Sequence, residues 1–529
     1  MNDEVVAALV HGFQLIVPEM ILGLAACVLF LGSTFRANRH VWAAVALTAL
    51  AAAALALWLG PVPLLSSEAS SAAINAGPVF LDPLGWLIKA IALASGMILV
   101  LFSWNEVPDR QAAEYHACLL LIIAGLSLTG VANDLVTLFL ALELISIPTY
   151  ILLYLPRQDT LSQEAALKYF LLSVFSSALL LFGFSYLYGL AGTTNISALI
   201  EALTKVTSPG PVVLPAVALI ALVMVVAGLS FRITAVPFHF YAPDVYQGAP
   251  TAAVALLAFV PKAAGFVALL RVLGFVWSGH SGTGSALGGP TQILLWLVAA
   301  VTMSLGNVLA LLQHNIKRLL AYSSVAHAGY MLIGLAATYQ LSRPGTADWF
   351  PGGVAALLFY LVAYGAMTVG AFAILAYLST PERPVEMEDD LAGLSTSHPG
   401  VALLMVLFLF SLIGIPGTAG FAGKFLLFYG AMAADSGSSF LFRWLALIGV
   451  VNSAIGAWYY LRIVARMYLH TPVHPLRNRR TLPALLAIWL CAAVTVWAGV
   501  YPEQMKRQAA TAAPAPRDQV GGAQAQKAD

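Results

Sequence analysis

Long apolar stretches separated by short polar segments follow one another along nearly the whole chain. Most of them reach the roughly 20 residues that a helix needs to cross a bilayer, and most charged side chains lie between them. The pattern therefore predicts fourteen transmembrane helices. The expected helices cover 13–33, 41–60, 82–104, 113–132, 134–155, 164–191, 213–238, 248–276, 291–312, 317–338, 352–379, 400–430, 440–468 and 482–501.

Composition agrees with a polytopic membrane protein of the all-α class. Hydrophobic residues make up 60% of the 529 residues and charged residues only 9%, whereas a soluble domain carries about a quarter charged residues. A net charge of +1 gives no reason to expect nucleic acid as a partner. The three cysteines lie singly in separate apolar stretches, which predicts neither a disulfide framework nor a metal site. The acidic start lacks the basic region of a signal peptide, so the first helix is expected to be retained.

One interrupted stretch, from Gly228 to Lys262, carries the most unusual chemistry. An apolar run reaches Arg232, is broken at Pro237 and His239, and continues through a polar patch into a second apolar run around Lys262. Proline removes a backbone donor from a helix. Within a bilayer such a break persists only where protein or trapped water satisfies the freed carbonyl groups. Two cations beside one break therefore indicate a functional site.

A second long run, from Val401 to Gly430, is also broken, at GIPGTAG around Pro416, and Lys424 follows the break. Two long helices that are each broken at proline beside a cation are typical of transporters built from inverted repeats. Sequence identity between the two halves is too low to establish such repeats by itself.

Glu143 lies about midway along a predicted helix that carries no other charge. An intramembrane carboxylate costs about 3 kcal/mol on insertion scales, so Glu143 is expected to be protonated or paired with a cation on another helix. A structural ion pair is one interpretation, and a proton-relay carboxylate is the other. Lys262 is surrounded by apolar residues about four turns from either end of its run. This position disfavours snorkelling and favours a lysine that exchanges its proton.

Several other ionisable residues are candidates with a structural alternative. Glu164 and Lys168 have the i,i+4 spacing of an ion pair on one helix face, which also suits an interfacial helix start. Arg232 keeps its proton and can hold a carboxylate. His239 beside the break could pass protons near neutral pH, but a satisfied buried histidine is at least as common, and His327 shares that ambiguity.

A structural role is favoured for the remaining acidic and basic residues near helix ends. This group comprises Glu19, Asp82 and Lys89, and the run Glu386, Glu388, Asp389 and Asp390 is expected to be a solvated loop. The CxxC, HExxH, P-loop and GxGxxG patterns are absent from the sequence. The chain therefore does not look like an electron carrier, and no metal or cofactor site is predicted.

Lysine and arginine favour alternate loops, beginning with the loop that holds Arg36 and Arg39 and including the one that holds Lys317 and Arg318. Positively charged loops stay in the cytoplasm. The bias places these loops in the cytoplasm of a bacterial inner membrane and both termini on the periplasmic side.

Five segments carry a resemblance to a known family: NDLVTLFLALELISIPTYILLYL, EAALKYFLLS, VPFHFYAPDVYQGAPT, NIKRLLAYSSVAHAGYM and GIPGTAGFAGKF. In this order, from roughly Phe80 to Leu469, they resemble the subunit N family of bacterial NADH-quinone oxidoreductase (respiratory complex I), the counterpart of mitochondrial subunit 2. The PDVYQGAPT form favours this family over subunits L and M and over the Mrp-type cation/proton antiporters. The chain also lacks room for the long lateral helix of subunit L.

The resemblance implies a domain organisation built on two inverted five-helix repeats. Its parts would be an N-terminal three-helix segment (1–105), a first antiporter-like repeat (106–276), a second repeat (277–470), a last transmembrane helix (471–501) and a disordered tail (502–529). The site residues would be Glu143, Lys262, Lys424, His239, and the pair Lys168 and Glu164, with helix breaks at Pro237 and Pro416. Arg232 departs from the family, which usually has lysine there, so a switch in which this cation gives up its proton is put in doubt.

The implied function is proton pumping within the membrane arm, coupled to quinone reduction elsewhere in the complex. Loosening or tightening of a Glu143–Arg232 pair would alter the proton affinity of Lys262, which would exchange protons with Lys424 and His239. NADH, FMN, iron–sulfur clusters and quinone would bind to other subunits, and the neighbours would include subunits M, K and J. The alternatives are an Mrp-type cation/proton antiporter subunit and a structural membrane scaffold.

Overall fold

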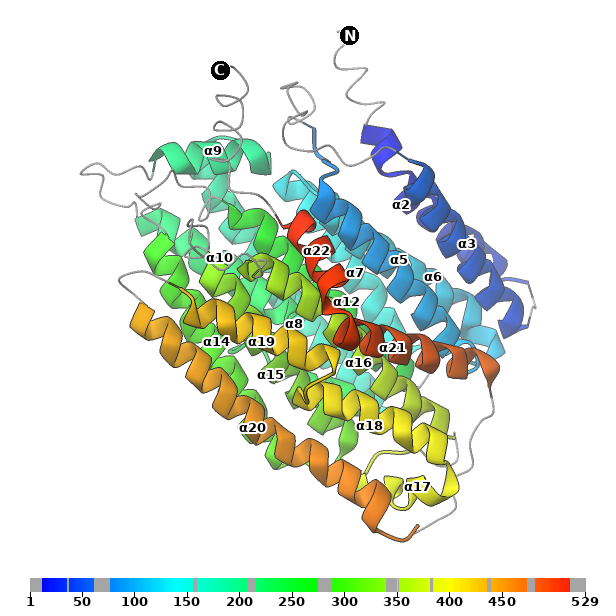
Figure 1. Cartoon of the computed structure of the whole chain (residues 1–529). Helices are drawn as coiled ribbons and strands as arrows, with labels where there is room; N and C mark the ends of the chain where they lie inside the picture. The colour runs from blue at the N-terminus through cyan, green and yellow to red at the C-terminus, as the bar shows by residue number, and fades with distance from the viewer. Residues whose placement is uncertain are drawn as a thin grey trace.

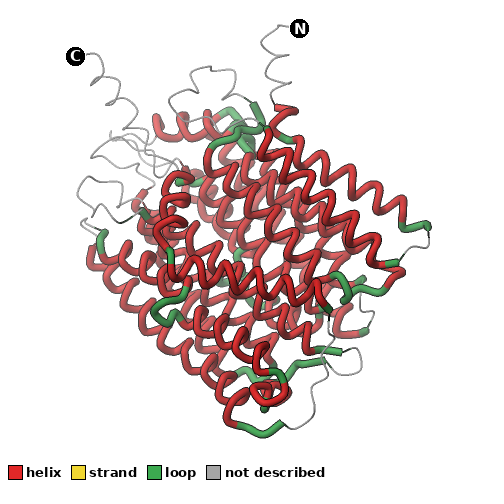
Figure 2. The backbone as a smooth tube through the Cα atoms, turned by 45° about the vertical axis from the view of Figure 1, so that its right-hand side comes forward, coloured by secondary structure: helices red, strands yellow, loops and turns green. Residues whose placement is uncertain are grey.

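The computed structural model is a bundle of α-helices (Figures 1 and 2). It describes residues 12–35, 38–60, 77–155, 159–206, 216–274, 288–338, 350, 352–380, 384–434, 439–472 and 481–513. Over these ranges no strand is present, and the extended pairing is limited to isolated bridges such as that between Asp134 and Asn195. The expected all-α membrane bundle is confirmed.

Eleven helices in the described ranges are long and apolar enough to cross a membrane. They are α3 (Arg39–Leu59), α5 (Pro83–Ser103), α6 (Ala112–Val131), α7 (Leu135–Tyr154), α8 (Thr160–Ala191), α12 (Thr251–Val272), α14 (Gly288–Leu311), α15 (Ile316–Ala337), α16 (Gly353–Leu378), α20 (Ser439–Leu469) and α21 (Leu482–Val500). Shorter apolar helices are α2 (Val17–Gly32), α10 (Ala216–Arg232), α18 (Pro399–Ile413) and α19 (Ala419–Met432). With α18 and α19 counted as one broken crossing, every predicted span contains helix.

Both predicted helix breaks are present. Helix α10 ends at Arg232, and the chain turns before the short helix α11 (Ala242–Gly248) continues the run. Helix α18 ends at Gly414, whose φ of 91° suits glycine, and α19 begins five residues later at Ala419. Each break leaves backbone carbonyl groups without a helical partner, so these carbonyls are free to accept hydrogen bonds from other side chains.

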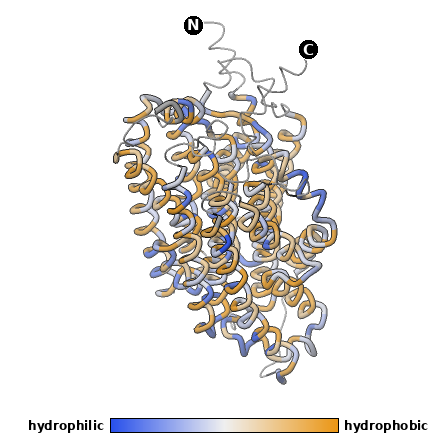
Figure 3. The backbone as a smooth tube through the Cα atoms, turned by 60° about the vertical axis from the view of Figure 1, so that its left-hand side comes forward, coloured by the Kyte–Doolittle hydropathy of each residue, from blue (hydrophilic) through white to orange (hydrophobic). Residues whose placement is uncertain are grey.

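Three helices form the centre of the bundle. The apolar windows of α12, α15 and α16 are 100%, 94% and 89% buried, against 33% for α3, α20 and α21. Figure 1 shows α2 and α3 at one edge of the bundle and α20 at the opposite edge. Figure 3 shows hydrophilic positions inside the hydrophobic bundle as well as at its ends. Central burial of α12 and α15 matters because these helices carry Lys262 and His327.

Two expectations for polar segments are wrong. The chain after Tyr501, expected to be disordered, begins with helix α22 (Pro502–Ala512), which packs its buried residues Met505, Ala509 and Ala512 against α16 and α5. Proline in the first turn and an alanine-rich sequence favour this helix. The rest of the tail, from 514 onward, lies outside the described residues.

The acidic run is not a simple solvated loop. The Glu388 side chain is only 4% exposed and accepts a hydrogen bond from Arg462 Nη2 at 2.5 Å. Asp389 pairs with Arg466, and Asp390 caps the backbone N–H groups of Glu386 and Met387. Burial raises the pKa of the Glu388 carboxyl, although Arg462 acts in the opposite direction. The loop therefore fastens the end of α20 to the rest of the bundle.

Candidate proton-transfer axis

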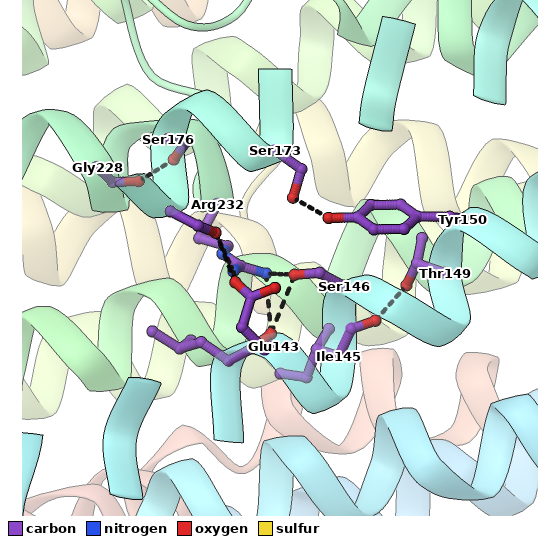
Figure 4. Close-up of polar contacts among 11 residues, drawn as sticks. Glu143, Ile145, Ser146, Thr149, Tyr150, Ser173, Ser176, Gly228 and Arg232 are labelled. Atoms are coloured by element: carbon purple, nitrogen blue, oxygen red, sulfur yellow. Dashed lines mark hydrogen bonds and ion pairs between the residues drawn. The ribbon is translucent and has the colours of Figure 1, made fainter. Parts of the chain in front are cut away.

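The Glu143 carboxylate forms an ion pair with Arg232 between α7 and α10. Arg232 Nη2 lies 2.9 Å from Glu143 Oε1, and Ser177 donates to the same oxygen at 2.5 Å. Arg232 Nη1 donates to Leu142 O at 3.0 Å and to the Ser146 hydroxyl. Figure 4 shows these groups converging on Glu143. The Arg232 side chain is 1% exposed and that of Glu143 is 20% exposed, so the expected cation on another helix is present.

Lys262, on the central helix α12, is fully buried. Its Nζ donates to Ile233 O at 3.1 Å, to the Thr234 hydroxyl and to Ser324 O at 2.9 Å. Ile233 and Thr234 belong to the break that follows Arg232, so the freed backbone of that break binds the lysine. Among the described residues, the ammonium has no carboxylate partner. All three of its hydrogen-bonding partners are neutral.

Lys424, on α19, has the same kind of environment at the other break. Its Nζ donates to Leu412 O, Ile413 O and Ser453 Oγ, each at 2.9 Å. It also lies 4.8 Å from the centroid of the Tyr330 ring, a distance at which the ring face attracts a cation. The parallel supports the prediction that each broken helix holds one cation.

His327 joins the two lysine sites. Its Nδ1 lies 2.5 Å from the Tyr360 hydroxyl and its Nε2 lies 3.2 Å from the Tyr460 hydroxyl. Its ring packs against that of Tyr364 at 5.3 Å, and against that of Tyr330, below Lys424, at 5.5 Å. Tyr364 donates to Ser324 Oγ at 2.7 Å, and the carbonyl of that serine binds Lys262.

Taken together, these contacts form a line of polar groups from Glu143 to Lys424. We call this line the buried axis; its members, in order, are Glu143, Arg232, Lys262, Ser324, Tyr364, His327, Tyr330 and Lys424. Arg232 joins Lys262 through Ile233, the next residue in the chain. Groups that hold or pass a proton therefore succeed one another through the centre of the bundle.

Lys168 and Glu164 form the predicted pair, at 2.7 Å, but they lie at an end of the bundle and away from Lys262. A third residue, Asp244 on α11, accepts hydrogen bonds from Lys168 at 2.6 Å and from Arg318 at 2.6 Å. Burial alone would raise the pKa of the Asp244 carboxyl, but the hydrogen bonds and charges of Lys168 and Arg318 outweigh it and hold this pKa below its ordinary value. Asp244 thereby fastens α11 to α8 and α15.

His239 is the one predicted site residue that the structure does not connect to the others. It lies half-buried between α10 and α11, and its Nδ1 has no hydrogen-bond partner among the described residues. The partners of Lys262 and Lys424 do not include it. Direct exchange of protons between His239 and either lysine is therefore not seen in this arrangement.

Two further ion pairs fit the structural role expected of them. Lys89 donates to both carboxylate oxygens of Glu19, at 2.6 and 2.8 Å, and to Leu15 O. Arg271 donates to both oxygens of Asp82, at 2.7 and 2.6 Å. Each pair ties together helices distant in sequence and makes no printed contact with the buried axis. Over the described ranges, no cluster of three His, Cys, Asp or Glu side chains is arranged to bind a metal ion.

A family model described as "NADH:quinone oxidoreductase/Mrp antiporter, TM" matches residues 132–456, a segment that contains every charged member of the buried axis. The chain belongs to this family. A protein named NADH-quinone oxidoreductase subunit N from Trichlorobacter lovleyi is 37% identical, over 93% of this chain and 95% of its own length. The protein of the same name from Desulfovibrio desulfuricans is 38% identical, over 96% and 98%.

Family members of known structure have the same fold. A chain of respiratory complex I from Thermus thermophilus is 29% identical and superposes with a TM-score of 0.73, covering 93% of this chain and 100% of that one. A chain of the Mrp complex from Dietzia superposes with a TM-score of 0.74 at 20% identity, covering 97% of each chain. At that identity the likeness shows the fold alone. The resemblance predicted from the five sequence segments is thus confirmed.

Sequence reasoning missed the tyrosines, Ser324 and Asp244. The tyrosines and the serine carry no charge, so nothing in a hydropathy pattern distinguishes them from ordinary helix residues. His327 was considered, but its two tyrosine partners lie 33 and 133 residues away and cannot be read from neighbouring positions. Asp244 stood inside the PDVYQGAPT segment; a lone acidic residue beside a predicted helix break was the available signal.

Proposed function

We propose that this chain is a proton-translocating membrane-arm subunit of an NADH-quinone oxidoreductase, and that the buried axis carries its protons. The observation that carries the proposal is the pair of lysines bound at two helix breaks and joined by a buried histidine and tyrosines. A scaffold would need its buried charges to be neutralised by partners, as Glu19 and Lys89 are. Lys262 and Lys424 are held by neutral acceptors instead, so neither is fixed in its charged form by a carboxylate contact.

The Glu143–Arg232 pair would control the proton affinity of Lys262. Arg232 stays charged, and its charge lies one residue from the carbonyl that Lys262 binds. Two charges about 4 Å apart interact by about 4 kcal/mol at an effective dielectric constant near 20. Since about 1.4 kcal/mol is a factor of ten, moving Glu143 toward or away from Arg232 would change a neighbouring proton-binding constant by up to about a thousandfold.

The proton would then pass between Lys262 and Lys424 through Ser324, Tyr364 and His327. The rigid central helices α12 and α15 position these groups, while the breaks around Pro237 and Pro416 supply the joints at which water could reach the axis. His239, beside the first break, would act as an accessory group there and not as a direct partner of a lysine.

The remaining features of the proposal concern the assembly. The relatives' name implies an oxidoreductase complex in which NADH, FMN, iron–sulfur clusters and quinone bind to other subunits, with subunits M, K and J as neighbours. The distribution of lysine and arginine supports loops containing Arg39 and Arg318 in the cytoplasm and both termini in the periplasm. The Asp244 cluster would then lie at the cytoplasmic end of the subunit.

The test is Lys262→Ala in the assembled complex. We expect NADH oxidation and assembly to persist while proton uptake by inverted membrane vesicles falls sharply, because the axis loses its central proton carrier. Lys506→Ala, outside the axis on α22, serves as the matched control and should pump normally. Undiminished proton uptake in Lys262→Ala would refute the relay, and loss of assembly alone would favour the scaffold. Sodium exchange by this chain without NADH would instead favour the Mrp-type antiporter.

A further inference from the structure

An apolar groove penetrates the bundle on a side that the proton axis does not use. It is open between α5, α16 and α21 and holds about 530 Å³ of empty space. Ile91, Ala94 and Ile98 of α5 and Val494 of α21 lie along its sides, and all four are partly or fully exposed. Its innermost wall is Phe259 of α12, three residues before Lys262. The groove thus runs from the surface of the bundle to the central helix.

The lining leaves no polar group to direct a polar ligand. Its only side-chain heteroatoms belong to Ser95 and Cys491. Ser95 already donates to Ala92 O at 2.9 Å, and the Cys491 side chain is buried within α21. The lining residues sit near the middle of their helices, at the depth of the hydrocarbon core in a spanning bundle. An occupant of this groove is therefore a long, flexible hydrocarbon.

The end of the groove nearest the C-terminus of α21 is bordered by a cationic helix. Helix α22 continues from α21 and packs against α5 and α16, the other two sides of the groove. It carries Lys506 and Arg507 against a single acid, Glu503. Arg507 is 81% exposed and lies 3.6 Å from Glu503, so most of its donors face outward. Its guanidinium suits a phosphate group.

We propose that this groove binds a phospholipid of the membrane, with one acyl chain lying against Phe259 and an anionic headgroup at Arg507 of α22. The chemistry of the two ends fits such a molecule: hydrocarbon alone in the groove, and a phosphate-binding cation at its border. Gly365 makes the contact possible, because a Cβ at this position would lie 2.6 Å from the Phe259 ring. The bound chain would touch the helix turn that carries Lys262.

The experiment is photolabelling of the intact complex in lipid nanodiscs with phosphatidylglycerol that bears a diazirine near the end of its acyl chain. We expect label on the α5 and α16 peptides that contain Ala94 and Ala366, both of which line the groove. Ala366→Phe should abolish most of this labelling by filling the groove. Ala52→Phe, at an exposed alanine of α3, is the matched control and should leave it unchanged.

The headgroup is tested with Arg507→Gln and with phosphatidylcholine carrying the same diazirine. We expect phosphatidylglycerol to label more strongly than phosphatidylcholine, and Arg507→Gln to remove the difference. Equal labelling of the groove in the wild type and in Ala366→Phe would overturn the proposal. So would a photo-crosslinker placed at Ala94 that captures a helix of a neighbouring subunit, because that helix would then be the occupant.

Discussion

Arg232 shows how one buried side chain can fix the start of a proton path. Its guanidinium donates to a carboxylate, two hydroxyl groups and a backbone carbonyl on two helices. A lysine has one ammonium on a flexible stem and cannot reach all of these acceptors from one position. Arginine at this position therefore keeps a permanent cation beside Glu143, and Lys262 is left as the nearest cation able to release its proton.

This assignment predicts different results for two substitutions of Arg232. Arg232→Gln leaves the Glu143 carboxylate without its cation, which for a buried pair costs about 3–5 kcal/mol; the partial exposure of Glu143 lowers that figure. We expect less assembled complex and strongly reduced proton pumping. Arg232→Lys keeps the charge and should retain more of both. Pumping and native-gel assembly measured side by side provide the check, and wild-type pumping in Arg232→Gln would contradict the role assigned to the pair.

His327 allows an internal comparison, because the chain contains a second buried histidine. His116 on α6 lies outside the axis, and its Nδ1 contacts only Ala112 O, at 2.7 Å. His327 instead bridges two tyrosine hydroxyl groups between the lysines. Both histidines are buried, so substitution of either should perturb packing to a similar extent.

We predict that His327→Phe lowers the number of protons pumped per NADH by severalfold, whereas His116→Phe at most lowers the amount of assembled complex. The unpaired tyrosine hydroxyl groups cost about 1–3 kcal/mol in the first variant, so thermal stability should fall moderately in it. Measurement of the pumped-proton ratio in reconstituted vesicles separates the two effects. An equal ratio in both variants would mean that His327 is only a packing residue.

At the scale of the helices, the breaks do more than interrupt the hydrophobic pattern. Each supplies carbonyl groups that bind one lysine from a neighbouring or following helix. The short helix α11 after the first break is held at its other side by Asp244, which binds α8 through Lys168 and α15 through Arg318. The position of the broken segment therefore depends on a charge cluster outside the membrane-spanning helices.

Asp244→Asn tests that dependence through pH. A pKa held below the ordinary value of about 4 means that the Asp244 contribution to stability is complete above that value and is lost only as pH falls through the folded-state pKa. Between about pH 6 and 8 Asp244 stays ionised. We therefore expect Asp244→Asn to lower the pumping rate without moving its pH midpoint in that range. A displaced midpoint would show that Asp244 itself takes up and releases the proton.

For the whole molecule, the sequence was sufficient to predict the features that depend on long apolar runs and on isolated charges. The fourteen spans, the two breaks, and the ion pairing of Glu143 with a cation all follow from the cost of placing polar groups in hydrocarbon. The link from Lys262 to Lys424 did not follow, because Ser324, Tyr364 and His327 come together only through packing of α15 against α16.

The errors have the same origin. Glu388 lies in a charged run and was expected to be solvated, yet Arg462, 74 residues away, pairs with it inside the bundle. Helix α22 was expected to be disordered because its composition is polar, but three of its residues are buried against α5 and α16. In both cases a distant part of the chain supplies the partner, so no local pattern announces it.

The central claim is that protons pass in series from Glu143 to Lys424. It is tested most directly by measuring NADH-driven proton pumping, per assembled complex, in Glu143→Gln, in Lys424→Gln and in the double variant. A single path predicts that the double variant pumps no less than the more severe single variant, because a path blocked once gains nothing from a second block. If the two losses multiply instead, the two residues act on separate routes and the account of one buried axis is contradicted.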